Sequence, residues 1–141
     1  MAGTVRDVMT AGAETLGEDE TILEAARRLA EANVGALPIL GADGEVRGML
    51  TDRDIAVKVV AEGRDPSEMK AGALAQGSVV TVSPDDSLDE ALKRMTAAEV
   101  RRLPVVEGEN LVGVVSQADL ARALPEEKAG ALVEAVAAST T

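Results

Sequence analysis

The sequence contains the same short motif twice, and this duplication limits the folds that the chain can adopt. The segment Gly48-Met-Leu-Thr-Asp-Arg-Asp-Ile55 recurs 65 residues later as Gly113-Val-Val-Ser-Gln-Ala-Asp-Leu120. Both copies join an apolar run to a polar stretch, so each is predicted to be the junction between a strand and a helix. The fold must therefore provide two equivalent junctions.

Each junction brings a hydroxyl, a carboxylate and free backbone N–H groups together. Thr51 or Asp52 in the first copy is a good N-cap, because a short side-chain oxygen accepts from the first helical N–H groups. Asp54 then lies in the first turn, where the helix dipole favours a carboxylate. Ser116 and Asp119 stand at the same places in the second copy. Such a junction could hold a polyhydroxyl or anionic ligand.

The duplication extends over most of the chain, and each half is predicted to run strand, helix, strand, strand, helix. Apolar residues at helical spacing predict helices over residues 21–32 and 88–98. Each helix is followed by a short strand with an internal proline, Pro38 or Pro104, and by a turn and a return strand. So long a match in register indicates an internal repeat.

The repeat gives the predicted domain boundaries. We assign residues 1–66 to the first repeat, residues 67–124 to the second, and residues 125–141 to a C-terminal helix and tail. The valines at 79, 80 and 82 predict a strand over residues 78–82. Because Pro38 has no N–H to donate, its strand is expected at a sheet edge or a bulge.

Composition excludes several classes of chemistry. The chain of 141 residues has no Phe, Tyr or Trp, so it offers no aromatic platform for stacking single-stranded nucleic acid. It has no Cys and no His, which removes disulfides, thiol and imidazole catalysis and the usual zinc sites. A net charge of −11 disfavours binding to nucleic acid or to an anionic membrane.

The sequence carries no signal for export or membrane insertion. Its N-terminus has no apolar signal core, and no apolar run is long enough to span a bilayer. We therefore expect a cytoplasmic protein, with no nucleic acid and no membrane among its partners.

Three features resemble those of the CBS domain, whose tandem pair is known as a Bateman module. The motif Gly-x-x-(Ser/Thr)-x-x-Asp is complete in both junctions. The segment Asp7-Val-Met-Thr10 is similar to the motif that opens the family's repeats, and Val34-Gly-Ala-Leu-Pro-Ile39 is matched by Val100-Arg-Arg-Leu-Pro-Val105. Within the family, the chain is most similar to small stand-alone proteins of the hypoxic-response type.

The resemblance implies a fold and a class of ligand. The fold is α/β (α+β), with two tandem β-α-β-β-α repeats packed sheet to sheet around a pseudo-twofold axis and two clefts between them. The ligand would be an adenosine-containing molecule, such as AMP, ATP or S-adenosylmethionine, and no cofactor is required. Two modules commonly associate through their helices, so a homodimer that signals to an unknown effector protein is expected.

The resemblance assigns ligand contacts to four residues of the junctions. Asp54 and Asp119 would accept hydrogen bonds from ribose hydroxyls. Thr51 and Ser116 would offer hydroxyl and N–H groups to ribose or phosphate. Each of the four residues has an alternative role as part of a helix cap.

Arg101 and Arg102 are the candidates for phosphate binding, because related proteins often place basic residues at these positions. Gly35 and Ala36 stand there in the first repeat, so only the second repeat carries this charge. Alternatively, the two arginines form a solvated pair that bridges to Glu99 or to a dimer partner.

The remaining candidates surround the junctions. Asp52 would repel a phosphate, although Arg53 beside it could offset the repulsion. The spacing of Asp52 and Asp54 gives no support for a magnesium site, and no metal site is expected. Four aliphatic residues would form walls for a base or, alternatively, belong to the core: Leu37, Pro38, Leu103 and Pro104.

An enzyme is not expected, because only carboxylates and hydroxyls are available as catalytic groups. The leading hypothesis is a non-enzymatic sensor that binds an adenosine-type ligand and signals to a separate partner. The alternative is a ligand-free, stress-associated interaction scaffold that acts through its dimer surface. The lack of basic residues at Gly35 and Ala36 favours the scaffold, and the two complete junction motifs favour the sensor.

Overall fold

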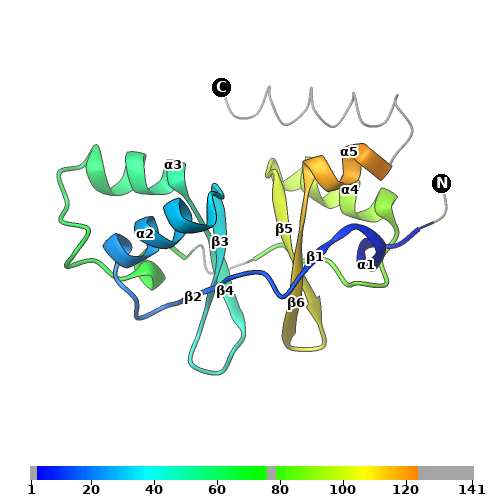
Figure 1. Cartoon of the computed structure of the whole chain (residues 1–141), viewed down its shortest axis with the longest axis horizontal. Helices are drawn as coiled ribbons and strands as arrows, with labels where there is room; N and C mark the ends of the chain where they lie inside the picture. The colour runs from blue at the N-terminus through cyan, green and yellow to red at the C-terminus, as the bar shows by residue number, and fades with distance from the viewer. Residues whose placement is uncertain (1–2, 76–78, 124–141) are drawn as a thin grey trace. The chain divides into compact units, whose positions relative to one another are not determined.

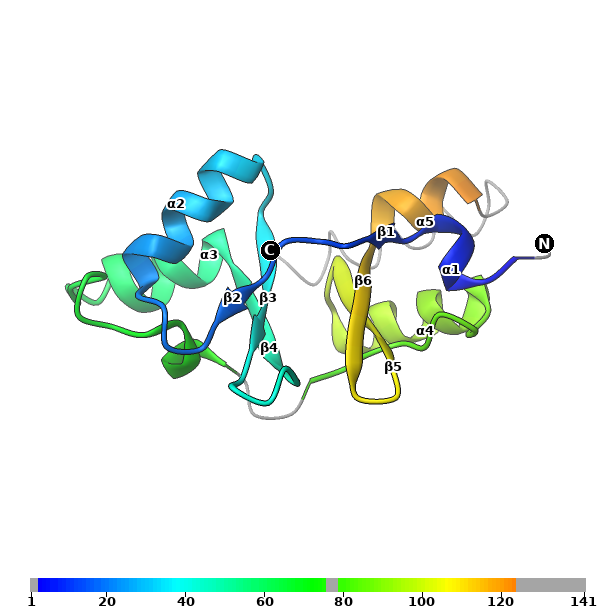
Figure 2. The same ribbon diagram turned by 60° about the horizontal axis from the view of Figure 1, so that its bottom comes forward.

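The computed structural model describes residues 3–75 and 79–123, and the chain forms two compact units (Figure 1 and Figure 2). The repeat-1 unit comprises residues 14–79, and the repeat-2 unit combines residues 1–13 with residues 80–141. The first residues of the chain therefore belong with the second repeat. The predicted C-terminal helix lies outside the described residues.

The repeat-1 unit is built on a three-stranded sheet with the order β2-β3-β4. Strand β2 runs parallel to β3, and β3 pairs antiparallel with β4. Both views show α2 and α3 on one side of this sheet. In chain order its elements are β2 (Leu16–Gly17), α2 (Ile22–Ala32), β3 (Ala36–Leu40), β4 (Val46–Thr51), α3 (Asp52–Ile55), the π-helix η1 (Ala56–Val60) and the 3-10 helix η2 (Ala71–Leu74).

The repeat-2 unit is built on a second three-stranded sheet, with the order β1-β6-β5 and antiparallel pairing throughout. Its elements are α1 (Val5–Val8), β1 (Thr10–Ala11), α4 (Leu88–Ala98), β5 (Arg102–Glu107), β6 (Asn110–Ser116) and α5 (Gln117–Ala123). The predicted mixed α/β architecture with two strand–helix repeats is therefore confirmed. The predicted packing of one sheet on the other remains a prediction.

Both hydrophobic cores consist of aliphatic side chains, as the lack of aromatic residues requires. In each unit one long helix is capped at its start by a hydroxyl, which comes from Thr21 in α2 and from Ser87 in α4. Each of these helices buries one face against its own sheet. The equivalent buried residues are Ile22, Ala25 and Leu29 in α2, and Leu88, Ala91 and Met95 in α4.

The opening segment of each repeat packs against the body of the other. In the repeat-2 unit, the Val5 N–H donates to the Asp86 carbonyl oxygen at 2.9 Å, and Val5 is fully buried. In the repeat-1 unit, the equivalent bond runs from the Ala71 N–H to the Glu20 carbonyl oxygen at 2.7 Å. The two donors, Val5 and Ala71, are 66 residues apart in the sequence, and so are the two acceptors, Glu20 and Asp86. The exchange of segments is therefore reciprocal.

The compact units therefore cut across the sequence repeats. Residues 1–66 and residues 67–124 remain the predicted division of the sequence, whereas the units are defined by packing. One strand prediction fails. Of the strand expected over residues 78–82, the described part forms a single bridge, between Val82 and Val105.

The expectation of an edge strand at Pro38 is wrong, because β3 is the middle strand of its sheet. The missing N–H is tolerated there because the short strand β2 pairs with β3 only at Ile39 and Leu40. A register shift between these two residues provides the irregularity that the proline suggested.

The pairing of the N-terminal strand β1 with β6 can be tested by a substitution at Gly113. It pairs with Ala11 of β1, and an added Cβ would lie 2.6 Å from the Thr10 carbonyl oxygen. We expect Gly113→Ala to lower the free energy of unfolding by about 1–3 kcal/mol, measured by urea denaturation with circular dichroism. Gly17→Ala is the control, since its Cβ would lie 3.7 Å from the nearest atom. Wild-type stability of Gly113→Ala would contradict the pairing of β1 with β6.

Candidate functional site

The first junction is closed by two reciprocal hydrogen bonds between Thr51 and Asp54. Thr51 ends β4 and caps α3, and its Oγ1 accepts from the Asp54 N–H at 3.0 Å. The Asp54 Oδ2 accepts in return from the Thr51 N–H at 3.1 Å. This arrangement is a capping box, which satisfies two backbone donors at the start of the helix.

The second junction repeats this arrangement. The Ser116 Oγ accepts from the Asp119 N–H at 3.1 Å, and the Asp119 Oδ2 accepts from the Ser116 N–H at 2.9 Å. The alternative role of these residues as helix caps is therefore confirmed in both repeats. Ligand contact by the same residues remains a prediction.

The other carboxylate oxygen of each aspartate meets a basic side chain of the same helical segment. The Lys58 Nζ lies 3.4 Å from the Asp54 Oδ1, and an Arg122 guanidinium nitrogen lies 2.6 Å from the Asp119 Oδ1. The basic side chains are 49% and 72% exposed, whereas the two aspartates are only 16% and 11% exposed. Sequence reasoning missed both partners, although their spacing of four and three residues allows contact on a helix.

The structure brings the two candidate arginines to the second junction. Arg102 is the register partner of Ser116, and the Arg101 carbonyl oxygen accepts from the Gln117 N–H at 2.8 Å. In the repeat-1 unit, Ala36 is the register partner of Thr51. The two junctions thus share a backbone frame and differ in charge.

The remaining candidates are divided between core and surface. Leu37 and Leu103 are 4% and 1% exposed and belong to the two cores, and Pro38 and Pro104 are also buried. A wall role for these four residues remains a prediction, and little of their surface is available for it.

Asp52 and Arg53 are exposed on the first junction, where the Asp52 Oδ1 accepts from the Arg53 N–H at 2.8 Å.

Among the described residues, no group of three or more Asp or Glu side chains is placed to hold a metal ion.

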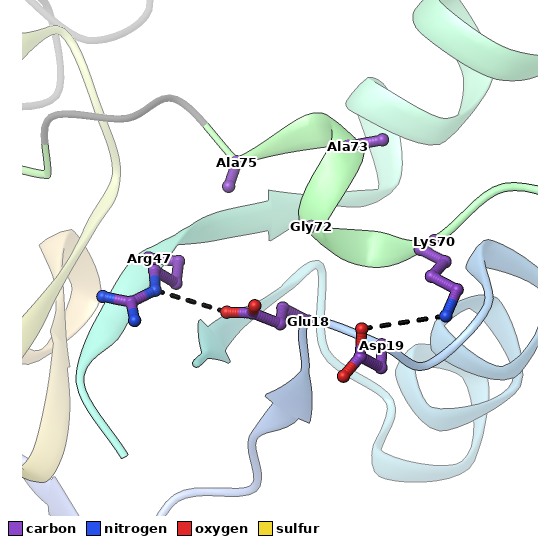
Figure 3. A pocket seen from close by; sticks show the side chains of 7 residues that line it. All are labelled: Glu18, Asp19, Arg47, Lys70, Gly72, Ala73 and Ala75. Carbon is purple, nitrogen blue, oxygen red and sulfur yellow. Dashed lines mark hydrogen bonds and ion pairs between the residues drawn. The ribbon is translucent and has the colours of Figure 1, made fainter. Parts of the chain in front are cut away.

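Two cavities in the repeat-1 unit were not foreseen from the sequence. A hollow of about 520 Å³ between α2 and α3 reaches the first junction at Gly35 and Asp52. A second cavity, of about 360 Å³, lies between the β2–α2 turn, β4 and η2, and contains none of the candidate residues (Figure 3). Its cations are paired, Arg47 with Glu18 at 3.2 Å and Lys70 with Asp19 at 3.7 Å.

The charges around the second cavity are held by local contacts. Hydrogen bonds from Arg47 to Asp43 and, less strongly, to Glu18 raise the pKa of its guanidinium above the ordinary value. Arginine is charged at any physiological pH, so this cavity offers charges that are compensated by neighbouring carboxylates rather than reactive groups.

Comparison with known proteins identifies the family. The sequence model of the CBS domain matches residues 5–61 and again residues 71–126, so the chain belongs to the CBS domain family. The match covers both junctions and both hairpins.

In the described residues, no helix has the length and apolar character needed to cross a membrane.

The similar proteins include small CBS proteins of comparable length. Hypoxic response protein 1 of Mycobacterium tuberculosis is 46% identical over 133 residues, covering 94% of this chain and 93% of that protein. A crystal structure of Hypoxic Response Protein I with two coordinated zinc ions is 46% identical with a TM-score of 0.81, and the match covers 87% of this chain and 100% of that one. The CBS domain-containing protein YhcV of Bacillus subtilis is 40% identical, over 90% of each chain.

A further solved structure contains adenosine-type ligands. The CBS domain pair of protein MJ0100, in complex with 5′-methylthioadenosine and S-adenosyl-L-methionine, is 27% identical with a TM-score of 0.76. It covers 86% of this chain and 98% of that chain.

The capping boxes can be tested by their contribution to stability. We expect Ser116→Ala to lower the free energy of unfolding by about 1 kcal/mol, because the Asp119 N–H loses its acceptor. Ser116→Thr keeps the hydroxyl and should retain most of the wild-type stability. Urea denaturation of the three proteins measures the difference, and equal stability of Ser116→Ala and wild type would show that the cap contributes nothing.

Proposed function

We propose that the protein is a non-enzymatic regulatory module that binds an adenosine-containing ligand at its junctions and signals to a separate partner. The observation that carries this proposal is the duplicated capping frame of Thr51 with Asp54 and Ser116 with Asp119. Each frame concentrates a hydroxyl, a carboxylate and backbone N–H groups at the end of a strand. A carboxylate has about four acceptor positions, so a ribose diol can bind beside the cap.

The family supports a regulatory rather than a catalytic role, because CBS domain proteins are generally regulatory. The adenosine-type ligands of the MJ0100 pair support the proposed ligand class. Zinc is not proposed as a ligand, although the structure of Hypoxic Response Protein I was solved with two zinc ions. This chain has neither Cys nor His, the residues that most often bind zinc in proteins.

Signalling requires two arrangements of the protein that bind the ligand with different affinity. We propose a homodimer in the cytoplasm, with an effector protein as the partner. The hollow between α2 and α3 supports a docking role for this face, since Ala26, Ala30, Val34 and Ile55 contribute to its lining. The name of the similar hypoxic response protein favours a role in a stress response.

Calorimetric titration with AMP, ATP and S-adenosylmethionine tests the proposal directly. Heat is the appropriate signal, because the chain has no aromatic side chain to report binding by fluorescence. We expect saturable binding of at least one ligand at micromolar concentration, on the order of −8 kcal/mol. No heat with any of the three, together with an unchanged melting temperature, would favour the scaffold alternative.

The second junction can be disabled without loss of the fold. We expect Asp119→Ala combined with Arg102→Ala to abolish nucleotide binding, because the ribose acceptor and a phosphate donor are both lost. Circular dichroism should show a folded protein, since neither residue is in the core. Arg27→Ala with Glu31→Ala removes the same charges from the exposed face of α2 and is the matched control. Unchanged affinity of the first double variant would place the ligand elsewhere.

A further inference from the structure

The exposed surface of the second junction is basic, although its motif is defined by an acidic residue. Asp119 is only 11% exposed, and both of its oxygens already accept hydrogen bonds, from the Ser116 N–H and from Arg122. Arg122 is 72% exposed, and its guanidinium nitrogen lies 2.6 Å from the Asp119 Oδ1. The guanidinium is therefore more accessible to a ligand than the carboxylate.

Arg122 has donors to spare after this contact. A guanidinium has five N–H groups, and the hydrogen bond to Asp119 uses one of them, from a terminal nitrogen. The planar arrangement of the others suits two oxygens of a phosphate group. The hydrogen bond to Asp119 also restrains the side chain, so that less conformational freedom is lost when an anion binds.

Arg102 approaches the same junction from the neighbouring strand. Its register partner is Ser116, the residue that caps the helix carrying Arg122. Two arginines from two elements of one unit thus flank a single cap. The sequence motif alone predicted only the contribution from the strand.

The first junction provides an internal comparison. Lys58 takes the place of Arg122 as the cation, but it is 3.4 Å from Asp54 and carries an ammonium group rather than a planar fork. Ala36 stands where the second junction has Arg102, and the charge of the exposed Asp52 offsets that of Arg53 beside it. The same backbone frame is therefore far less suited to an anion.

We propose that Arg122 is a specificity-determining residue, which binds the phosphate of an adenosine nucleotide together with Arg102 at the second junction. Asp119 then positions Arg122, in addition to capping the helix and accepting from the ribose. The second junction would prefer phosphorylated adenosine over adenosine itself and over the sulfonium cation of S-adenosylmethionine. The first junction would not make this distinction. This inference rests on the proposed binding of adenosine-type ligands.

The test compares adenosine, AMP and inorganic phosphate by calorimetric titration of wild type and three variants. Wild type should bind AMP at least tenfold more tightly than either adenosine or inorganic phosphate. Arg122→Ala should weaken AMP binding at least tenfold and leave adenosine binding unchanged. Arg122→Lys should give an intermediate loss, because it keeps the charge and loses the planar fork. Arg27→Ala, which removes a guanidinium from the exposed face of α2 outside both junctions, is the matched control and should bind AMP like wild type.

Three results would overturn the inference. Unchanged AMP affinity in Arg122→Ala would reduce Arg122 to a helix ion pair, and tighter binding would make it a competitor for the carboxylate. Inorganic phosphate binding as tightly as AMP would contradict recognition of a nucleotide. In all three cases, adenosine binding by wild type would leave the proposed function standing. If wild type bound neither adenosine nor AMP, the proposed function itself would fail.

Discussion

The reciprocal pair of hydrogen bonds at each strand-to-helix junction is the interaction on which the site depends. It satisfies backbone donors that the first turn of a helix otherwise leaves open. It also fixes the carboxylate of Asp54 or Asp119 against the end of its strand. The same atoms thus determine where the helix starts and where a polar ligand can be recognised. A substitution that disturbs recognition there is expected to change stability as well.

Because the two opening segments are exchanged, each compact unit contains residues from both sequence repeats. Val5 is buried in the repeat-2 core, and Ala71 is buried in the repeat-1 core. The chain therefore passes from one unit to the other near residues 13–14 and again near residues 79–80. These connections link the two units covalently.

The sequence predicted the features that depend on local chemistry. Helices α2 and α4 and both hairpins follow from the spacing of apolar residues and from turn residues, and the structure confirms them. The pairing of β1 with β6 was missed, because two residues give too short a pattern to show a strand. The middle position of β3 was also missed, since a local pattern does not reveal how many neighbours a strand has.

The charge of the candidate site was only partly predictable. Arg101 and Arg102 could be located because related proteins often place basic residues at these positions, and the structure makes Arg102 the register partner of Ser116. The contact of Arg122 with Asp119 could not, since ion pairs at this spacing are common on any exposed helix. The functional interpretation of this contact depends on how deeply the Asp119 carboxylate is buried, which is a property of packing.

The central claim is that the junctions are the ligand-binding parts of the molecule. Backbone amide NMR spectra of ¹⁵N-labelled protein, recorded during titration with AMP, test it most directly. The account predicts that the largest shift changes fall on Ser116, Asp119 and the amides of Arg101 and Arg102. Changes confined to the cavity between β4 and η2, or spectra that do not respond to the nucleotide, would contradict it.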